Sequence, residues 1–299
     1  MKKIIVIFLA LILLCPPALA DEETIVTSFF PIHLFARNLL DGIDGVELVS
    51  LAEPGAGCLH DYQLQTGDMK QLARADAFLI NGAGMEGYLS GIFDAFPALP
   101  VVDASRGVTL LEDCSDHGHD HEHDHEHLFN AHIWLDARNA IQMVYNLADG
   151  LIAALPAHAD VIAANRDAYI ARLSAVHDEL PPALTTVTSK DVITFHEAFP
   201  YFAKAYGLHV AAVINRDPDE ALSPRTLGEL CKTVTALGVP PLFIEPQYED
   251  KAAQAISRET GAPSYTLDPI VTGPQDAPLT YYEDVMRQNL SILLTALTH

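Results

Sequence analysis

Residues 115–127 hold the densest group of metal-capable side chains in this 299-residue chain. Six of the 14 histidines alternate there with acidic residues or glycine: His117, His119, His121, His123, His125 and His127. Imidazole nitrogens and carboxylate oxygens are ligands for borderline metals such as Zn²⁺. The segment has no apolar face to bury, so we expect a solvated loop without a fold of its own. We interpret it as a metal-handling loop rather than as a charged insertion that serves solubility alone.

The same segment contains the HExxH pattern of metalloproteases, at His121, Glu122 and His125. That signature requires a stable helix with both histidines on one face. The polar residues around it provide no apolar stripe by which a helix could pack. We therefore interpret the match as an accident of composition, and a secreted zinc-dependent hydrolase is the alternative from the enzyme class.

Four further metal-capable residues lie after predicted strands or where the chain returns from the histidine-rich segment: His60, His132, His196 and Asp268. In open parallel sheets, ligands bind beyond the carboxyl ends of the strands. Each half of the chain contributes two of these residues, so a cleft between two lobes could hold all four. Three imidazoles and one carboxylate complete a tetrahedral Zn²⁺ shell with no open position for water, which favours binding over catalysis.

Other residues could support or replace these ligands. Glu197 and Glu245 also lie at strand ends, and either could be a supporting group or an alternative ligand. A single histidine near a strand end more often forms a local hydrogen bond, so the joint placement of the four residues carries the prediction. Four histidines on or beside helical or strand patterns are interpreted as surface or core residues: His33, His158, His177 and His209.

The elements that must position these residues form alternating strand and helix patterns in both halves of the chain. In the first half we predict strands at 24–29, 46–51, 77–80 and 101–103, with helices at 31–40, 68–75 and 87–96. In the second half we predict strands at 191–195, 209–214, 242–244 and 264–267, with helices at 198–206, 224–237, 250–260 and 280–297. Such alternation predicts parallel sheets covered by helices on both faces.

The longest helical pattern lies between the halves. Asp136 is the predicted N-cap of its first helix, which Pro156 interrupts. A second helix is predicted at 160–180, with Pro181 and Pro182 as its end. The predicted fold is α/β, with two lobes, each a four-stranded mostly parallel sheet flanked by helices, joined by a long connecting helix.

The N-terminus is typical of a cleavable export signal. Lys2 and Lys3 form a basic region, residues 4–15 form a short apolar run, and Ala18-Leu19-Ala20 is a cleavage pattern. The apolar run is far shorter than the about 20 residues that cross a bilayer, so we predict a free periplasmic protein. The expected divisions are a signal peptide at 1–20, an N-terminal lobe at 21–135 with the histidine-rich loop, helices at 136–182 and a C-terminal lobe at 183–299.

The formal net charge of the chain is −23, with 40 acidic against 17 basic residues. A chain this acidic should repel nucleic acid and anionic lipid surfaces and should favour cationic ligands. We therefore expect no nucleic-acid partner, and we expect a monomer.

Three cysteines follow the signal peptide: Cys58, Cys114 and Cys231. An oxidising compartment permits one disulfide and leaves one thiol over. A Cys58–Cys114 bond is conceivable and stays open, and Cys231 is expected to be a buried free thiol.

Several stretches carry a specific resemblance: Thr27-Ser28-Phe29-Phe30-Pro31, Pro54-Gly55 through His60-Asp61-Tyr62, Ala131-His132-Ile133-Trp134-Leu135-Asp136, His196-Glu197-Ala198-Phe199-Pro200-Tyr201-Phe202, Phe243-Ile244-Glu245-Pro246-Gln247 and Leu267-Asp268-Pro269. They occur in order across the chain. In them the chain resembles the periplasmic zinc-binding proteins of ABC transporters, a group of metal-binding solute receptors that also contains manganese receptors.

The resemblance implies two α/β lobes bridged by a long rigid helix, with the metal between them and with His60, His132, His196 and Asp268 as its ligands. It implies a high-affinity receptor that delivers Zn²⁺ to an inner-membrane ABC permease, with the histidine-rich loop as an accessory low-affinity site. Manganese receptors resemble this group but have a carboxylate at the position of His196, which favours zinc here. The alternatives are a manganese receptor of the same family, a surface adhesin, and a periplasmic zinc buffer without a transporter.

Overall fold

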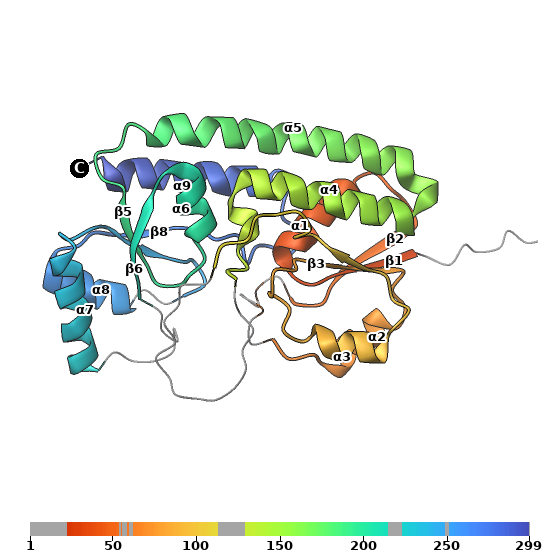
Figure 1. The fold of residues 1–299 in the computed structure, drawn as a ribbon, viewed down its shortest axis with the longest axis horizontal. Helices are drawn as coiled ribbons and strands as arrows, with labels where there is room; N and C mark the ends of the chain where they lie inside the picture. The colour runs from red at the N-terminus through yellow and green to blue at the C-terminus, as the bar shows by residue number, and fades with distance from the viewer. Residues whose placement is uncertain are drawn as a thin grey trace, which may run out of the picture.

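The computed structural model describes residues 23–53, 55, 59, 62–112, 129–214, 223–248 and 251–298. Several predictions lie outside these residues: the signal peptide, His60, the histidine-rich loop, Cys58 and Cys114. The described residues form two lobes side by side, each built on a four-stranded sheet (Figure 1). The predicted fold class is confirmed, and every strand pair in both sheets is parallel.

The N-terminal sheet has the strand order β2-β1-β3-β4. Its strands are β1 (Glu23–Thr27), β2 (Val46–Ser50), β3 (Ala77–Ile80) and β4 (Val101–Asp103). The helices of this part are α1 (Phe30–Leu39), α2 (Thr66–Leu72), α3 (Leu89–Ala95) and α4 (Ala137–Ala154). Helices α2 and α3 cover one face of the sheet, and α1 and α4 cover the other (Figure 1). Because strand side chains alternate between faces, Ile25 and Val26 of β1 enter two different apolar cores.

The C-terminal sheet has the strand order β6-β5-β7-β8. Its strands are β5 (Asp191–Thr194), β6 (His209–Val213), β7 (Leu242–Ile244) and β8 (Ser264–Thr266). The helices are α6 (Pro200–Tyr206), α7 (Pro224–Ala236), α8 (Lys251–Thr260) and α9 (Tyr281–Leu297). Residues of α7 and α8 pack on the face that presents Leu242, whereas residues of α6 and α9 share a core with Phe243 of the opposite face.

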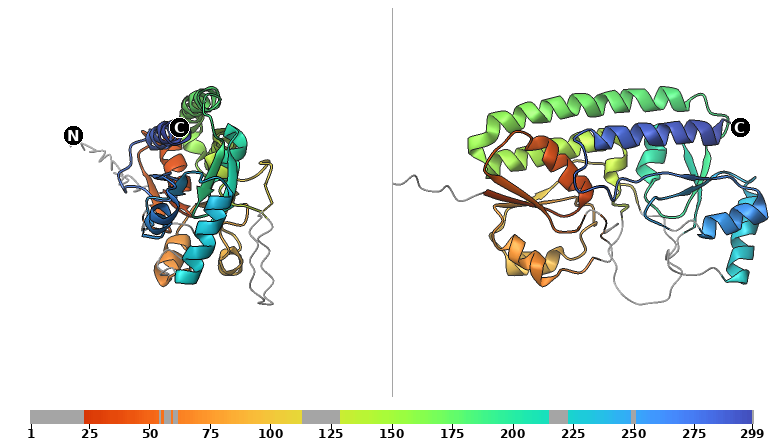
Figure 2. Two further views of the ribbon diagram at one scale, coloured as in Figure 1. Left: turned by 90° about the vertical axis from the view of Figure 1, so that its left-hand side faces the viewer. Right: turned by 180° about the vertical axis from the view of Figure 1, so that it is seen from behind.

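The connecting helix α5 (Ala159–Leu184) runs along both lobes (Figures 1 and 2). The predicted cap of α4 is confirmed, because the Asp136 carboxylate accepts a hydrogen bond from the Arg138 backbone N at 2.9 Å. The predicted end of the second helix is wrong, because Pro181 and Pro182 lie inside α5. Proline keeps a helical φ but has no N–H to donate, so each proline removes one intrahelical hydrogen bond, and the helix ends two residues after Pro182.

One apolar core passes through both lobes. It includes Leu79 of the first sheet, Phe243 of the second sheet and Leu173 of α5. Smaller cores lie under α2 and α3 and under α7 and α8. The lobes therefore share a packed interior.

Within the described ranges, no single helix is long and apolar enough to cross a membrane. Helix α4 and the segment 156–184 pass that test only as a pair bent by 116°.

Polar contacts join α1, α5 and α9 where the lobes meet. Arg172 of α5 donates from Nε to Glu283 Oε1 of α9 at 2.6 Å and from Nη2 to Asn38 Oδ1 of α1. Its guanidinium carbon lies 4.8 Å from the centroid of the Tyr169 ring. We call these four residues the Arg172 junction, and they tie the first helix of the N-terminal lobe to the last helix of the C-terminal lobe.

His33 of α1 is largely buried, and its Nδ1 lies 3.2 Å from Thr27 Oγ1. Burial and then the charge of Arg37 lower the pKa of His33 from 6.5 to about 4. The imidazole of His33 thus binds a proton less readily in the folded protein than in the unfolded chain. Its contribution to stability is complete above the unfolded pKa and is lost as pH falls toward 4, by about 3 kcal/mol in total.

We expect the His33→Gln variant to lack this pH dependence. Burial raises the pKa of Glu86 to about 7, and this group acts in the opposite direction, so variant and wild type must be compared at each pH. The difference between their free energies of unfolding, from urea melts, should shrink by about 3 kcal/mol between about pH 7.5 and about pH 4. A difference that stays constant with pH would contradict the burial of neutral His33.

Candidate metal centre

Two of the predicted ligands lie side by side at the junction of the lobes. His132 directly precedes the short 3₁₀ turn η2 (Ile133–Leu135), and His196 lies just beyond the end of β5. Their ring centroids are 4.9 Å apart, with the ring planes at 81°. The His132 residue is only 1% exposed. The fold thus brings imidazoles from the two halves of the chain close enough to serve as ligands of one ion.

Glu245 supports His196. It directly follows β7, is 1% exposed, and its Oε1 lies 3.1 Å from His196 Nδ1. Its Oε2 accepts a hydrogen bond from Gln247 Nε2. A carboxylate beside one imidazole nitrogen holds the proton on that nitrogen and directs the other nitrogen toward a metal. Of the two roles predicted for Glu245, support of a ligand fits this contact.

Asp268 lies just after β8 on a segment that is fixed by α9. Its backbone N donates to Asn289 Oδ1 at 2.9 Å, and its backbone O accepts from Asn289 Nδ2 at 2.7 Å. Its carboxylate atom Oδ1 accepts from the Ile270 backbone N at 2.7 Å. The backbone of Asp268 is therefore held by Asn289, and its Oδ1 is held by the Ile270 N–H. The bond to Ile270 leaves the second carboxylate oxygen, Oδ2, unused.

Trp134 connects the segments that carry His132 and Asp268. Its indole Nε1 donates to Pro269 O at 2.8 Å, and its ring centroid lies 5.2 Å from that of His132. The ring also packs edge-on against Phe29, with centroids 5.3 Å apart. A single buried side chain thus sets the spacing between two of the predicted ligand segments.

The charges around Asp268 favour a cation. Burial raises the pKa of Asp268, the Ile270 N–H opposes this, and the nearby charge of Glu245 adds to the rise. The pKa of Tyr281 is raised by burial and then by the charge of Asp268. Two carboxylates therefore lie near each other in a largely buried place. A divalent cation at this point would stabilise the charged form of both.

The described residues alone do not complete a metal shell. Among them, no three His, Cys, Asp or Glu side chains are grouped so that they could hold an ion. The structure pairs His132 with His196 and places Asp268 on a segment tied to His132, whereas His60 lies outside the described residues. The assignment of all four as ligands stays a prediction.

Sequence reasoning missed the polar side chains that hold these segments. Gln247 contacts Glu245, and Asn289 holds the backbone of Asp268. One signal was available: Asn289 is fully buried in α9 among apolar residues such as Met286 and Leu290. A lone buried amide in an apolar pattern needs a partner, and here the partner is the ligand segment.

The four histidines set aside as surface or core residues make other contacts. His177 Nε2 accepts from Arg138 Nε at 2.8 Å, and the exposed His209 lies 2.8 Å from Asp191. Cys231 is a free cysteine, as predicted, but it is only partly buried. It lies on α7 and packs against the apolar core between this helix and the sheet.

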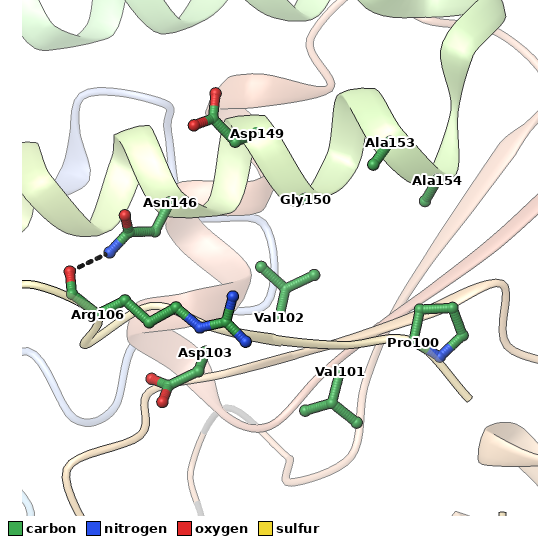
Figure 3. A pocket seen from close by; sticks show the side chains of 10 residues that line it. All are labelled: Pro100, Val101, Val102, Asp103, Arg106, Asn146, Asp149, Gly150, Ala153 and Ala154. Atoms are coloured by element: carbon green, nitrogen blue, oxygen red, sulfur yellow. Dashed lines mark hydrogen bonds between the residues drawn. The ribbon is translucent and has the colours of Figure 1, made fainter. Parts of the chain in front are cut away.

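A pocket of about 470 Å³ lies between β4 and α4, and Figure 3 shows its lining. Asn146 crosses from α4 to the chain after β4, with Nδ2 donating to Ala104 O at 2.7 Å and to Arg106 O at 2.8 Å. Gly150 allows the helix to approach the strand, because a Cβ there would lie 2.4 Å from Val102 Cγ1. None of the predicted ligands lines this pocket.

Residues 25–296 of the chain match the protein family described as zinc-uptake complex component A, periplasmic. The chain belongs to this family. The resemblance found in the sequence is thereby confirmed, and the match covers both lobes and the connecting helices. Membership of this zinc-uptake family agrees with a location outside the cytoplasm.

The chain is also similar in sequence to proteins named for zinc binding and zinc uptake. Zinc-binding protein AdcA of Streptococcus pyogenes serotype M6 is 28% identical over 287 residues, which cover 90% of this chain and 55% of AdcA. The chain therefore spans about half the length of that relative. High-affinity zinc uptake system protein ZnuA of Brucella abortus is 29% identical over 320 residues, covering 94% of this chain and 95% of ZnuA.

A solved structure shows the same fold. Zn(II)-bound AdcA from Streptococcus pneumoniae superposes with a TM-score of 0.80 at 24% identity, covering 93% of this chain and 58% of the AdcA chain. At this identity the likeness concerns the two-lobed architecture, which is the part of the zinc-uptake family fold that positions His132 and His196.

Proposed function

We propose that this chain is an extracytoplasmic receptor that binds Zn²⁺ with high affinity and delivers it to an inner-membrane ABC permease. The observation that carries the proposal is the 4.9 Å approach of the His132 and His196 rings where the lobes meet. The names of the relatives, which refer to zinc binding and zinc uptake, support the same ion. Zinc is here the transported cargo and not a resident cofactor.

The proposed shell consists of His60, His132, His196 and Asp268. Because Nδ1 of His196 faces Glu245, its Nε2 is the nitrogen that would bind the ion. Three neutral imidazoles and one carboxylate leave one positive charge on the occupied shell, and the neighbouring Glu245 offsets it. A shell filled by the protein leaves no position for a reactive water, so we infer binding rather than catalysis. Three imidazoles favour Zn²⁺ over Mn²⁺, which prefers oxygen ligands.

The remaining parts of the chain receive supporting roles in this proposal. The histidine-rich loop at 115–127 is a second, weaker site that binds several ions near the cleft. The net charge of −23 supports a cation as ligand and argues against a nucleic-acid partner. We infer a monomeric periplasmic protein, exported by the signal peptide at 1–20, with lobes at 21–135 and 183–299 joined by the helices at 136–182.

A pair of variants tests the tight and the weak site in the same calorimetric titration with Zn²⁺. The His60→Ala variant should lose tight binding, because the shell lacks a ligand, and should keep the weaker binding of the loop. Deletion of residues 117–127 should have the reverse effect, with fewer ions bound and the tight site unchanged. Each variant is thus the control for the other.

The opposite results are equally informative. Undiminished tight binding by the His60→Ala variant would exclude His60 from the shell, and loss of all tight binding on deletion would place the main site in the loop. Delivery is tested in cells: a strain with only the His60→Ala protein should fail to accumulate zinc at low external zinc. Peptidase activity that survives replacement of His60 and His196 would favour the hydrolase instead.

A further inference from the structure

Asn130 makes contacts on both sides of the metal centre. It is 4% exposed, and both atoms of its amide have partners. Its Oδ1 accepts from the His132 backbone N at 3.0 Å and lies 3.3 Å from His132 Nδ1. Its Nδ2 donates to the backbone O of Glu197 at 2.7 Å. Glu197 directly follows His196, so one side chain touches the segments of both paired histidines.

The backbone of Asn130 is fixed as well. Its N donates to Leu111 O at 2.9 Å, and its O accepts from the Tyr201 hydroxyl at 2.9 Å. The same hydroxyl oxygen accepts from the Leu111 backbone N at 2.9 Å. Asn130 is therefore held between a segment of the N-terminal lobe and helix α6 of the C-terminal lobe, and its side chain has little freedom to turn.

These partners determine the orientation of the amide and the tautomer of His132. A backbone N–H can only donate and a carbonyl oxygen can only accept, so Oδ1 must face His132 and Nδ2 must face Glu197. Since Oδ1 is an acceptor, the 3.3 Å contact assigns the proton of the neutral ring to His132 Nδ1. The unprotonated nitrogen is then Nε2, which is the one that can coordinate a metal.

We propose that Asn130 is the positioning residue of the zinc site: its carbonyl fixes the tautomer and ring orientation of His132, while its NH₂ group holds the turn that carries His196. The inference rests on the proposed function, in which both histidines bind the ion. It adds a neutral amide that contacts His132 without being a ligand and helps to set the 4.9 Å spacing of the two rings. Such supporting contacts affect metal affinity by about 10- to 100-fold in other metal sites.

The test compares Asn130→Ala with the matched control Asn146→Ala. The control also removes a side-chain amide that bonds two backbone groups, but it lies in the pocket between β4 and α4. Zinc affinity is measured by competition with a chelator. Asn130→Ala should weaken binding about 10- to 100-fold, and Asn146→Ala should leave it unchanged. Asn130→Asp keeps the acceptor for His132 but cannot donate to Glu197, so it should fall between these two.

A second measurement separates positioning from general destabilisation. Nitrogen-15 NMR of the metal-free protein at about pH 8 reports which ring nitrogen of His132 is protonated. Wild type, Asn130→Asp and Asn146→Ala should show the Nδ1–H form, and Asn130→Ala should show a mixture. Where Asn130→Ala does not fold, the affinity and tautomer of Asn130→Asp decide the question.

Two results would overturn the proposal: an Asn130→Ala affinity equal to that of Asn146→Ala, or an unchanged Nδ1–H form in Asn130→Ala. The proposal would also be overturned if the Asn130→Asp variant bound zinc as tightly as wild type, or if its His132 lost the Nδ1–H form. The His132→Ala variant, titrated in parallel, tests the proposed function itself. If it binds zinc as tightly as wild type, the ligand assignment fails, whereas the NMR measurement still reports on Asn130 because it needs no metal.

Discussion

Replacement of Arg172 with alanine should lower the free energy of unfolding by about 3 kcal/mol. The change leaves the Glu283 carboxylate, which is 2% exposed, without the cation that lies 2.6 Å from it. It also removes the donor to Asn38 and the cation over the Tyr169 ring. Breaking a buried ion pair costs about 3–5 kcal/mol, and the 38% exposure of the Arg172 side chain places the effect at the lower end.

The matched control is Arg74→Ala, which breaks an exposed pair in which Arg74 Nη2 lies 3.2 Å from Glu47. Exposed pairs contribute at most about 1 kcal/mol, so this variant should unfold close to wild type. Urea unfolding can be followed by the fluorescence of Trp134, the single tryptophan of the chain. Adding Glu283→Gln to Arg172→Ala should recover part of the loss, because the stranded charge is removed. Equal midpoints for the two arginine variants would show that the Arg172 junction does not stabilise the fold.

Replacement of Trp134 with alanine should cost about 3–5 kcal/mol of stability and should also weaken zinc binding. The indole is fully buried, packs on Phe29 and His132, and donates to Pro269 O at 2.8 Å. Its removal opens a cavity between the lobes and leaves that carbonyl without its donor. His132 loses a packing surface and the segment of Asp268 loses an anchor, so affinity and stability should fall together.

Two other variants isolate the cause of this effect. Phe93→Ala removes an aromatic ring that is 49% exposed, and it should change the free energy of unfolding far less. Trp134→Phe keeps most of the packing but lacks the indole N–H, and an unpaired buried carbonyl costs about 1–3 kcal/mol. Unfolding is followed by circular dichroism, since the fluorophore is lost. If the Trp134→Ala protein is as stable as the Phe93→Ala protein, Trp134 does not hold the segments of His132 and Asp268 together.

Local sequence predicted the strands best where an apolar run ends at turn residues. Strand β3 has the predicted bounds, 77–80, because the apolar run stops at Asn81 and Gly82, and β4 and β7 also have theirs. The end of α5 was not predictable in this way. The two prolines at 181 and 182 are tolerated because the helix ends shortly after them against the rest of the C-terminal lobe, which is a property of packing and not of the local residues.

The candidate site was predictable to the extent that topology decides it. Ligands lie beyond the carboxyl ends of parallel strands, and this rule places His196 just after β5. His132 follows no strand, so only the packing of the two lobes brings it beside His196. Asn130 could not be found by that rule. Its bond to Glu197 joins residues far apart in the sequence, and it forms only because α6 packs beside the turn that begins at His132. The assignment of His60, His132, His196 and Asp268 as ligands remains a prediction.

The apolar core that both lobes share has a consequence for how tightly an ion can be held. A receptor that opens and closes must select its binding-competent conformation, and the apparent affinity falls by the fraction of molecules in that conformation. Here Leu79, Leu173 and Phe243, from the two lobes and the connecting helix, belong to one apolar core, and a hinge motion that separates the lobes would disrupt this core. We expect such a state to be rarely populated in the proposed receptor. Most of the intrinsic affinity of the donor set should then be retained, and entry and exit of the ion should depend on local motions at the cleft.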